Sequence, residues 1–200
     1  MVIDLAAIML NKLNFNKMIT TANIKNGVNV DQLVETIGAV QGNPELAKFE
    51  FRTKNNWIEG GHCVSSMKSF YGVGQEDTTR KETFTMECDH PNVLLGEDKA
   101  ATPAEVVLHA LGSCLTGAMV YHAAANGIEI EGAESSLKGG CDLHGFLGLD
   151  PEVRKGFDGI TVRLKVKSDA SEEQLRNLAM FSPVFDIISN PTPIAIEIVK

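Results

Sequence analysis

The sequence contains one long apolar stretch without a charged side chain, from Val106 to Ala125. A stretch of this length is long enough to cross a bilayer as a helix. However, it also contains His109, Ser113 and His122, it is rich in Ala and Gly, and amphipathic segments surround it. A core helix that is buried on all sides has the same pattern. We therefore predict a central core helix, with no membrane span, and a fold that is organised around this helix.

Both ends of the predicted central helix carry local signals. Thr102-Pro103-Ala104-Glu105 has the pattern of a capping box, with Thr at the N-cap, Pro at the first helical position and Glu at the third. Asn126-Gly127 is a typical C-terminal stop, because Gly readily adopts the left-handed conformation. The helix is therefore expected to run between these two segments.

The other predicted elements are short strands and helices in an α+β order. Alternation of apolar and polar residues indicates strands, and Ser-x-x-Gln and Ser-Pro patterns indicate helix starts. Hairpin strands interrupted by two main helices indicate an α+β fold, not a doubly wound sheet. In chain order we expect a helix over 30–40, strands over 49–57, 63–71 and 82–88, a loop over 72–79, the central helix, strands over 128–131 and 134–138, a glycine-containing loop over 139–159, a strand over 160–166, a helix from the capping box at 171–174 to about 181, a helix from 183 to 190, and a last strand over 194–198.

Composition limits the class of protein. The chain has 200 residues and a formal net charge of -8, without a cluster of Lys and Arg, so we expect one soluble domain and no nucleic-acid partner. It has four cysteines and no Cys-x-x-Cys pair, which is typical of reduced thiols in the cytoplasm. The apolar first ten residues carry Asp4 and no positive charge, so they make a poor signal peptide.

Cys114 is the first residue that could carry chemistry. Its neighbours on the helix, three and four residues away, are mostly small: Ala110, Gly117 and Ala118. A free cysteine in such a niche is either inert packing or a positioned nucleophile. Near the C-terminus, Ser182 stands at a predicted helix start, where a cysteine would be activated by the helix dipole but a serine is simply a good N-cap.

Three segments pair a thiol with an imidazole, and both groups can bind zinc. They are His62-Cys63, Cys88-Asp89-His90 and Cys141-Asp142-Leu143-His144. Their spacings match no standard zinc pattern. We predict no metal and no cofactor.

Several motifs together resemble the osmotically inducible protein C and organic hydroperoxide resistance (OsmC/Ohr) family. The resemblance extends from about Phe49 to the end of the chain and leaves residues 1–47 as an N-terminal extension with a short helix, followed by an OsmC-like domain over 48–200. The motifs are Trp57-Ile58-Glu59-Gly60-Gly61, Leu94-Leu95-Gly96-Glu97, Pro103-Ala104-Glu105, Leu111-Gly112-Ser113-Cys114-Leu115 and Ser182-Pro183-Val184-Phe185-Asp186.

The resemblance implies an intertwined homodimer, with antiparallel sheets wrapped around two main helices. In peroxidase members of the family, a cysteine on the central helix attacks an organic hydroperoxide, and a second cysteine then forms a disulfide with it. An arginine and a glutamate keep the first thiolate reactive, and dithiols such as lipoylated proteins reduce the disulfide.

Carried over position by position, the resemblance makes Cys114 the attacking cysteine and Ser182 the place of the second one. A serine cannot form a disulfide, so the two-cysteine cycle is closed to this chain. Glu105 stands one residue from the place of the family's glutamate, and it either serves the site or only completes its capping box. For the activating cation the alternatives are His62 and Arg80, each of which is otherwise an ordinary loop residue.

Two functions follow from the resemblance. The first is a cytoplasmic stress-response protein that reduces organic hydroperoxides through Cys114 alone, with an external thiol reductant. The second is a homodimer without enzyme activity that binds a small apolar or thiol-reactive ligand in the same place. The loss of the second cysteine at Ser182 favours the second reading, and the motif around Cys114 favours the first.

Overall fold

The computed structural model describes residues 22–200. The described residues form two compact units: residues 22–24 together with 29–102, and residues 25–28 together with 103–200. A small two-stranded sheet pairs β1 (Ile24–Lys25) with β2 (Val28–Asn29). The apolar first ten residues lie outside the described part, and the predicted domain boundary at residue 48 stays a prediction.

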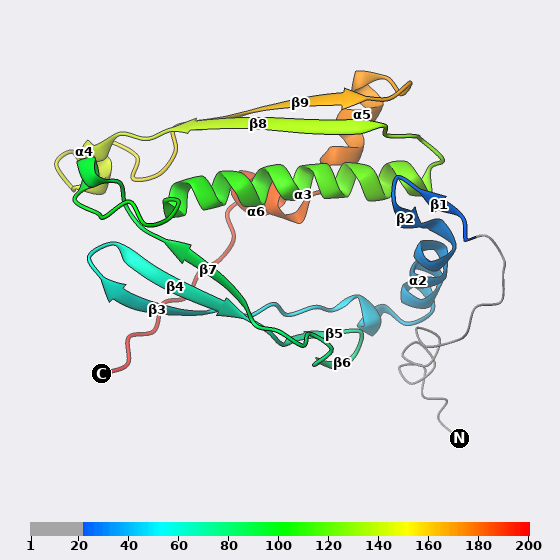
Figure 1. Ribbon diagram of the computed structural model, residues 1–200, viewed down its shortest axis with the longest axis horizontal. Helices are drawn as coiled ribbons and strands as arrows, with labels where there is room; N and C mark the ends of the chain where they lie inside the picture. Colours follow the sequence, from blue (N-terminus) through cyan, green and yellow to red (C-terminus); the bar gives the residue numbers. More distant parts are fainter. Residues whose placement is uncertain (1–21) are drawn as a thin grey trace. The chain divides into compact units, whose positions relative to one another are not determined.

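The first unit consists of a helix and two small antiparallel sheets (Figure 1). The sheet order β3-β4-β7 makes β4 the central strand of three, and β5 pairs with β6. Asn29 caps the first helix by accepting a hydrogen bond from the backbone N–H of Gln32. The elements are α2 (Val30–Gly42), the 3₁₀ helix η1 (Pro44–Ala47), β3 (Lys54–Glu59), β4 (His62–Met67), β5 (Phe70–Gly72), β6 (Gln75–Asp77), β7 (Phe84–Cys88) and the 3₁₀ helix η2 (Asn92–Leu94).

The second unit is built on the central helix α3 (Pro103–Ala125). Two long antiparallel strands, β8 (Gly132–Gly140) and β9 (Gly159–Lys167), lie along this helix (Figure 1). The short helix α4 (Leu143–Phe146) interrupts their connection, and α5 (Glu172–Ala179) and α6 (Pro183–Ser189) pack on α3. The pairings β3-β4, β4-β7, β5-β6 and β8-β9 are antiparallel, and the α+β class is confirmed.

The core of the second unit lies on one side of α3. Leu111, Leu115 and Met119 are buried there, together with Ala179 of α5. Alternate residues of β9 pack against this cluster, because successive side chains of a strand point to opposite faces. These inward residues are Ile160, Val162, Leu164 and Val166.

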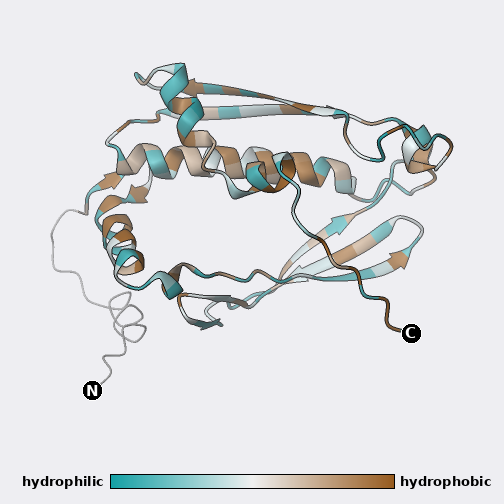
Figure 2. Cartoon of the chain, turned by 180° about the vertical axis from the view of Figure 1, so that it is seen from behind, coloured by the Kyte–Doolittle hydropathy of each residue, from teal (hydrophilic) through white to brown (hydrophobic). Residues whose placement is uncertain are grey.

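Helix α3 is long and apolar enough to span a membrane by length and composition, and it is the only such helix among residues 22–200. In this structure it contacts β8, α5 and α6. Figure 2 shows the hydrophobic residues that recur along its length. These contacts support the interpretation of α3 as the core helix of its unit.

Local signals predicted the end of α3 and the start of α5 correctly. Gly127 has a φ of 72°, and the N–H groups of Gly127 and Ile128 donate to the carbonyls of Ala124 and Ala123, as in a Schellman motif. The capping box between Ser171 and Gln174 is present in both directions. The capping role of Thr102 and Glu105 at the start of α3 stays a prediction.

Several predicted boundaries are wrong because strands need partners. Strand β3 begins at Lys54, and of residues 49–53 only Glu50 makes a bridge, to Tyr71. Residues 128–131 precede the strand, the predicted loop over 72–79 contains β6, and the predicted loop over 139–159 contains α4. The last predicted strand does not form: residues 191–200 are exposed and have no ladder partner among residues 22–200, so their N–H and C=O groups gain nothing from an extended ladder.

The packing of the loop after β7 leads to a stability prediction. A Cβ added at Gly96 would overlap the backbone carbonyl of His90, which is rigid, whereas a Cβ added at Gly38 in α2 meets no atom within 4 Å. Gly96→Ala is therefore expected to lower the free energy of unfolding by about 2–3 kcal/mol. Gly38→Ala, at an exposed helical position of the same unit, is expected to raise it by about 0.5–1 kcal/mol. Chemical denaturation of both variants checks this, and an equal or opposite ranking would show that the loop does not pack this way.

Candidate functional site

Cys114 lies in the middle of α3, at the margin of the buried stripe. Its thiol is free and partly exposed. At about 100° per residue, it lies about a quarter turn from the centre of the stripe formed by Leu111, Leu115 and Met119. The same flank of the helix carries Val107 and Tyr121, seven residues before and after Cys114, which are 41% and 56% exposed. Cys114 is thus held on a rigid element with open space on one side.

Ser182 is fully used by its own helix. It is 1% exposed, and its hydroxyl accepts a hydrogen bond from the backbone N–H of Phe185 at 3.1 Å. Pro183 follows as the first residue of α6, and Val184 and Phe185 pack on the α3 core. The N-cap role predicted from the sequence is therefore confirmed.

Glu105 lies on the opposite side of α3 from Cys114. Nine residues separate the two, which is two and a half turns and about 13 Å along the helix axis. Glu105 instead lines a cavity of about 340 Å³ together with His109, Ser113 and Ser135. The two residues that the resemblance places in one site, Glu105 and Cys114, therefore lie apart within this chain.

The two cation candidates belong to the first unit, and each has partners there. The Nε2 atom of His62 lies 3.0 Å from Oε2 of Glu87 on the neighbouring strand. The guanidinium of Arg80 lies over the ring of Phe70, 4.9 Å from its centroid, and donates to the carbonyl of Lys68 at 3.2 Å. These contacts hold both side chains within their own unit, and activation of Cys114 by either of them stays a prediction.

Asp89 organises the loop that follows β7, and sequence reasoning missed this role. Its carboxylate is 1% exposed and accepts hydrogen bonds from the backbone N–H groups of His90, Glu97 and Lys99 at 2.7–3.2 Å. Burial opposes ionisation of this carboxyl, but the hydrogen bonds from the three N–H groups outweigh it and hold its pKa below the ordinary value. The Asp-His-Pro sequence at the end of a strand was the available signal, because Asp often accepts hydrogen bonds from the backbone of a turn.

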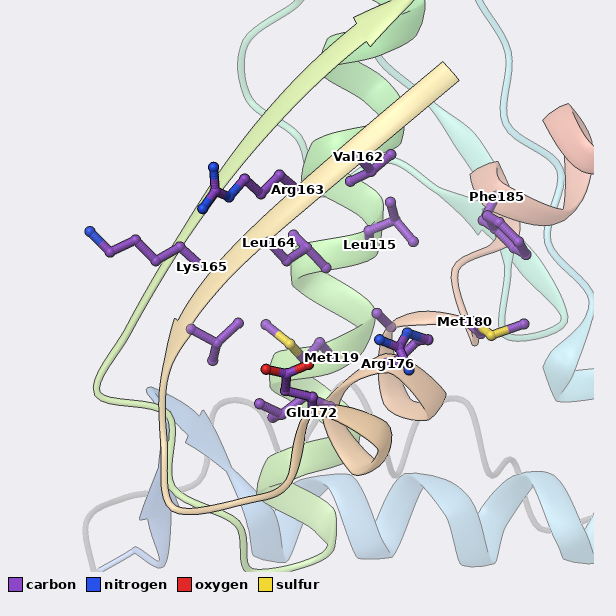
Figure 3. Close-up of a pocket in the computed structure, with 13 residues that line it drawn as sticks. Leu115, Met119, Val162, Arg163, Leu164, Lys165, Glu172, Arg176, Met180 and Phe185 are labelled. Carbon is purple, nitrogen blue, oxygen red and sulfur yellow. The ribbon is translucent and has the colours of Figure 1, made fainter. Parts of the chain in front are cut away.

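The larger of two cavities in the second unit is mostly apolar, although Glu172 and Arg176 of α5 also line it, and it lies between β9, α3 and α5 (Figure 3). It has a volume of about 760 Å³. Leu115, Met119, Val162 and Leu164 face it, whereas Arg163 and Lys165 project away from α3. Cys114 lines neither this cavity nor the smaller one. Within residues 22–200, no three His, Cys, Asp or Glu side chains are grouped so that they could hold a metal ion.

Comparison with known proteins places this α+β arrangement in a class. The OsmC-like protein family matches residues 96–197, just over half of the chain. The chain therefore belongs to the OsmC-like family, as the sequence motifs predicted. No curated protein matches the chain.

Solved structures agree on the fold. An OsmC-like protein from Mycoplasma pneumoniae is 14% identical with a TM-score of 0.53, and the match covers 71% of this chain and 89% of that one. An organic hydroperoxide resistance protein OsmC from Legionella pneumophila is 19% identical with a TM-score of 0.44, covering 69% of this chain and 88% of that one. An OsmC-like protein of unknown function from Vibrio cholerae is 14% identical with a TM-score of 0.46, covering 72% and 94%. At these identities the likeness shows the fold alone, and the first of the three carries it.

The buried carboxylate leads to a prediction about pH. Because the pKa of Asp89 is lower in the folded state, its contribution to stability is present above the ordinary pKa of about 3.9 and is lost as the pH falls through the folded value. Asp89→Asn is expected to melt at a lower temperature than the parent protein at pH 7, with a difference that shrinks below about pH 4. Thermal melts from pH 7 to pH 3 check this.

A matched control is Asp169→Asn, at an exposed position. It is expected to leave the melting temperature nearly unchanged across the same range. A difference between Asp89→Asn and the parent that stays constant down to pH 3 would mean that the charge of Asp89 is not what the loop requires.

Proposed function

We propose that this OsmC-like protein reduces organic hydroperoxides through Cys114 by a one-cysteine mechanism, as part of a stress response in the cytoplasm. The observation that carries the proposal is the place of Cys114: a free, partly exposed thiol in the family's matched region, fixed on the core helix of its unit. Membership of the family supports a redox role. The precise mechanism rests on Cys114 and on the tests below.

The proposed reaction needs one protein thiol and two external ones. The Cys114 thiolate attacks the terminal oxygen of the hydroperoxide, the O–O bond breaks, and the alkoxide leaves and takes up a proton to give the alcohol. Cys114 is then a sulfenic acid. A reductant thiol attacks its sulfur and releases water, and a second reductant thiol breaks the resulting mixed disulfide and restores Cys114.

The residue at position 182 supports a reductant that is external to the chain. In the two-cysteine cycle the second thiol stands where this chain has Ser182, and a hydroxyl cannot donate electrons to a sulfenic acid. Ser182 is also fully engaged in capping α6.

The other predicted site residues, Glu105, His62 and Arg80, have contacts of their own away from Cys114. Glu105 is half a turn away from Cys114 around α3, so we assign it to the small cavity beside His109 and Ser135 rather than to the thiol. Arg80 and His62 remain the proposed cations, and each would have to leave or share the partners that it has in the first unit.

A second function, ligand binding without turnover, is supported by the large apolar cavity. Its walls of Leu115, Met119 and Leu164 are suited to an aliphatic group, and the cavity does not include Cys114. In this reading Cys114 is a packed or passively modified thiol. Turnover with a reductant separates the two functions, because ligand binding alone consumes no hydroperoxide.

The peroxidase proposal predicts a selective effect of one cysteine. Cys114→Ser is expected to reduce consumption of cumene hydroperoxide with a dithiol to the rate seen without protein, because no other proposed step forms the sulfenic acid. Cys141→Ser, in an exposed loop, is the matched control and is expected to keep the parent rate. Hydroperoxide loss and trapping of the sulfenic acid by dimedone are measured together. Unchanged turnover in Cys114→Ser would rule the proposal out, and absence of turnover in the parent protein would favour ligand binding.

We also propose that the protein functions as a homodimer that covers the open flank of α3. Val107 and Tyr121 are large, exposed and in line with Cys114, and an exposed apolar stripe of this kind is typical of an interface. Tyr121→Arg is expected to shift the protein from dimer to monomer in light scattering after size-exclusion chromatography. Ser136→Arg, at an exposed position on β8, is expected to leave the dimer intact. A monomeric parent protein at micromolar concentration would contradict the proposal.

A further inference from the structure

The first unit contains two cysteines that lie side by side on neighbouring strands. Cys63 of β4 is directly opposite Cys88 of β7 in the antiparallel register, and 24 residues separate the two along the chain. Both thiols are free and both residues are partly exposed. Residues that face each other across an antiparallel pair have their side chains on the same face of the sheet. The two sulfur atoms are therefore neighbours by register, not by chance contact of loops.

The spacing of this register suits a disulfide bond. Opposite residues of antiparallel strands have Cα atoms about 4.5–5.5 Å apart. Disulfides join Cα atoms about 4.4–6.8 Å apart, with Cβ atoms slightly closer than in a relaxed strand pair. A bond between Cys63 and Cys88 therefore needs only a small approach of β4 and β7. Because that approach costs some strain, the bond is expected to be easily reduced again.

The pKa of the Cys88 thiol also depends on its surroundings in the sheet. Burial raises the pKa of the Cys88 thiol, and the neighbouring Cys63 sulfur raises it further. Both effects favour the protonated thiol of Cys88 near neutral pH. Neither residue matches the position of a cysteine that the family resemblance uses, and the proposed function makes no use of them.

We propose that Cys63 and Cys88 form a reversible cross-strand disulfide with low-molecular-weight disulfides such as oxidised glutathione as the oxidant. The thiolate of Cys63 attacks one sulfur of oxidised glutathione, the S–S bond breaks, and glutathione thiolate leaves. The thiolate of Cys88 then attacks the Cys63 sulfur of the mixed disulfide and releases the second glutathione thiolate. The two protein thiols lose two protons and two electrons, and two molecules of reduced glutathione carry them away.

The bond would connect the central and outer strands of the β3-β4-β7 sheet. It closes a loop that contains β5 and β6, and it lies directly before Asp89, which holds the following loop. Trp57 of β3 is opposite Cys63 on the other side of β4, so a tryptophan and the two thiols form one row across the sheet. Trp57 is the single tryptophan of the chain, so its fluorescence reports on this row alone.

The test uses the full chain with Cys114→Ser and Cys141→Ser, which leaves the pair as its only thiols. The protein is equilibrated with oxidised glutathione at pH 8, quenched with an alkylating agent and examined by mass spectrometry. We expect loss of both free thiols, no bound glutathione, and one linked peptide pair that contains Cys63 and Cys88. Dithiothreitol is expected to restore both thiols. Peptide mapping of the unsubstituted chain, which does not depend on the folding of any variant, is expected to show the same link.

Trp57 fluorescence follows the same reaction in solution. Because a disulfide quenches a nearby indole, we expect emission to fall on oxidation and to recover on reduction. The added substitution Cys63→Ser is expected to abolish this change and to leave Cys88 as a glutathione adduct. Stable glutathione adducts on both cysteines of the intact pair, two thiols that stay free, or an equal fall of emission in Cys63→Ser would each overturn the proposal. None of these outcomes bears on hydroperoxide reduction by Cys114.

Discussion

Burial of one side of α3 is the contact on which the second unit depends. Leu111, Leu115 and Met119 pack against the inward side chains of β9 and against α5 and α6. Each such side chain contributes about 1.5–3 kcal/mol when it is fully removed from water. The partners of α3 are not stable by themselves, because a two-stranded ribbon is marginal in water and helices of eight and seven residues are too short to persist alone. The position of Cys114 is fixed by the same contact, since its neighbour Leu115 is part of it.

Features with local causes could be predicted from the sequence. The end of α3 at Gly127, the capping box at Ser171 and the N-cap at Ser182 are each determined by a few adjacent residues, and all three are present. The strand over 160–166 could also be predicted, because its alternation reflects one buried and one exposed face. The place of Cys114 on a core helix followed from the uncharged stretch around it.

Features that depend on distant partners could not be predicted. Residues 49–53 and 194–198 alternate as strands do, yet only Glu50 forms a β-bridge with another of the residues 22–200. The motif alone does not show that Glu105 and Cys114 lie on opposite sides of α3; that follows only from the geometry of the helix. The pairing of Cys63 with Cys88 depends on the register between β4 and β7, which are separated by a hairpin and a loop, and the sequence alone showed only two cysteines near histidines.

The two units use sulfur and oxygen differently. In the second unit the hydroxyl of Ser182 caps α6, and Cys114 therefore has no second cysteine at that position. In the first unit two thiols stand in one row with a tryptophan, on a sheet whose loop is held by the carboxylate of Asp89. The chain thus has a single thiol, Cys114, on a helix of one unit and a pair of thiols, Cys63 and Cys88, on a sheet of the other.

Strand β9 has a further property that follows from its pairing. It is hydrogen-bonded to β8 on one side only, and no other strand of the described residues occupies its second edge. Backbone N–H groups of an antiparallel strand point alternately to its two neighbours. Along the nine residues of β9, amides directed at β8 are protected by the ladder, while those between them face an unpaired edge. The side chains of β9 therefore alternate between a buried and an exposed face. In the perpendicular direction, within the plane of the sheet, its backbone N–H groups alternate between slowly exchanging hydrogens that face β8 and rapidly exchanging hydrogens at the unpaired edge.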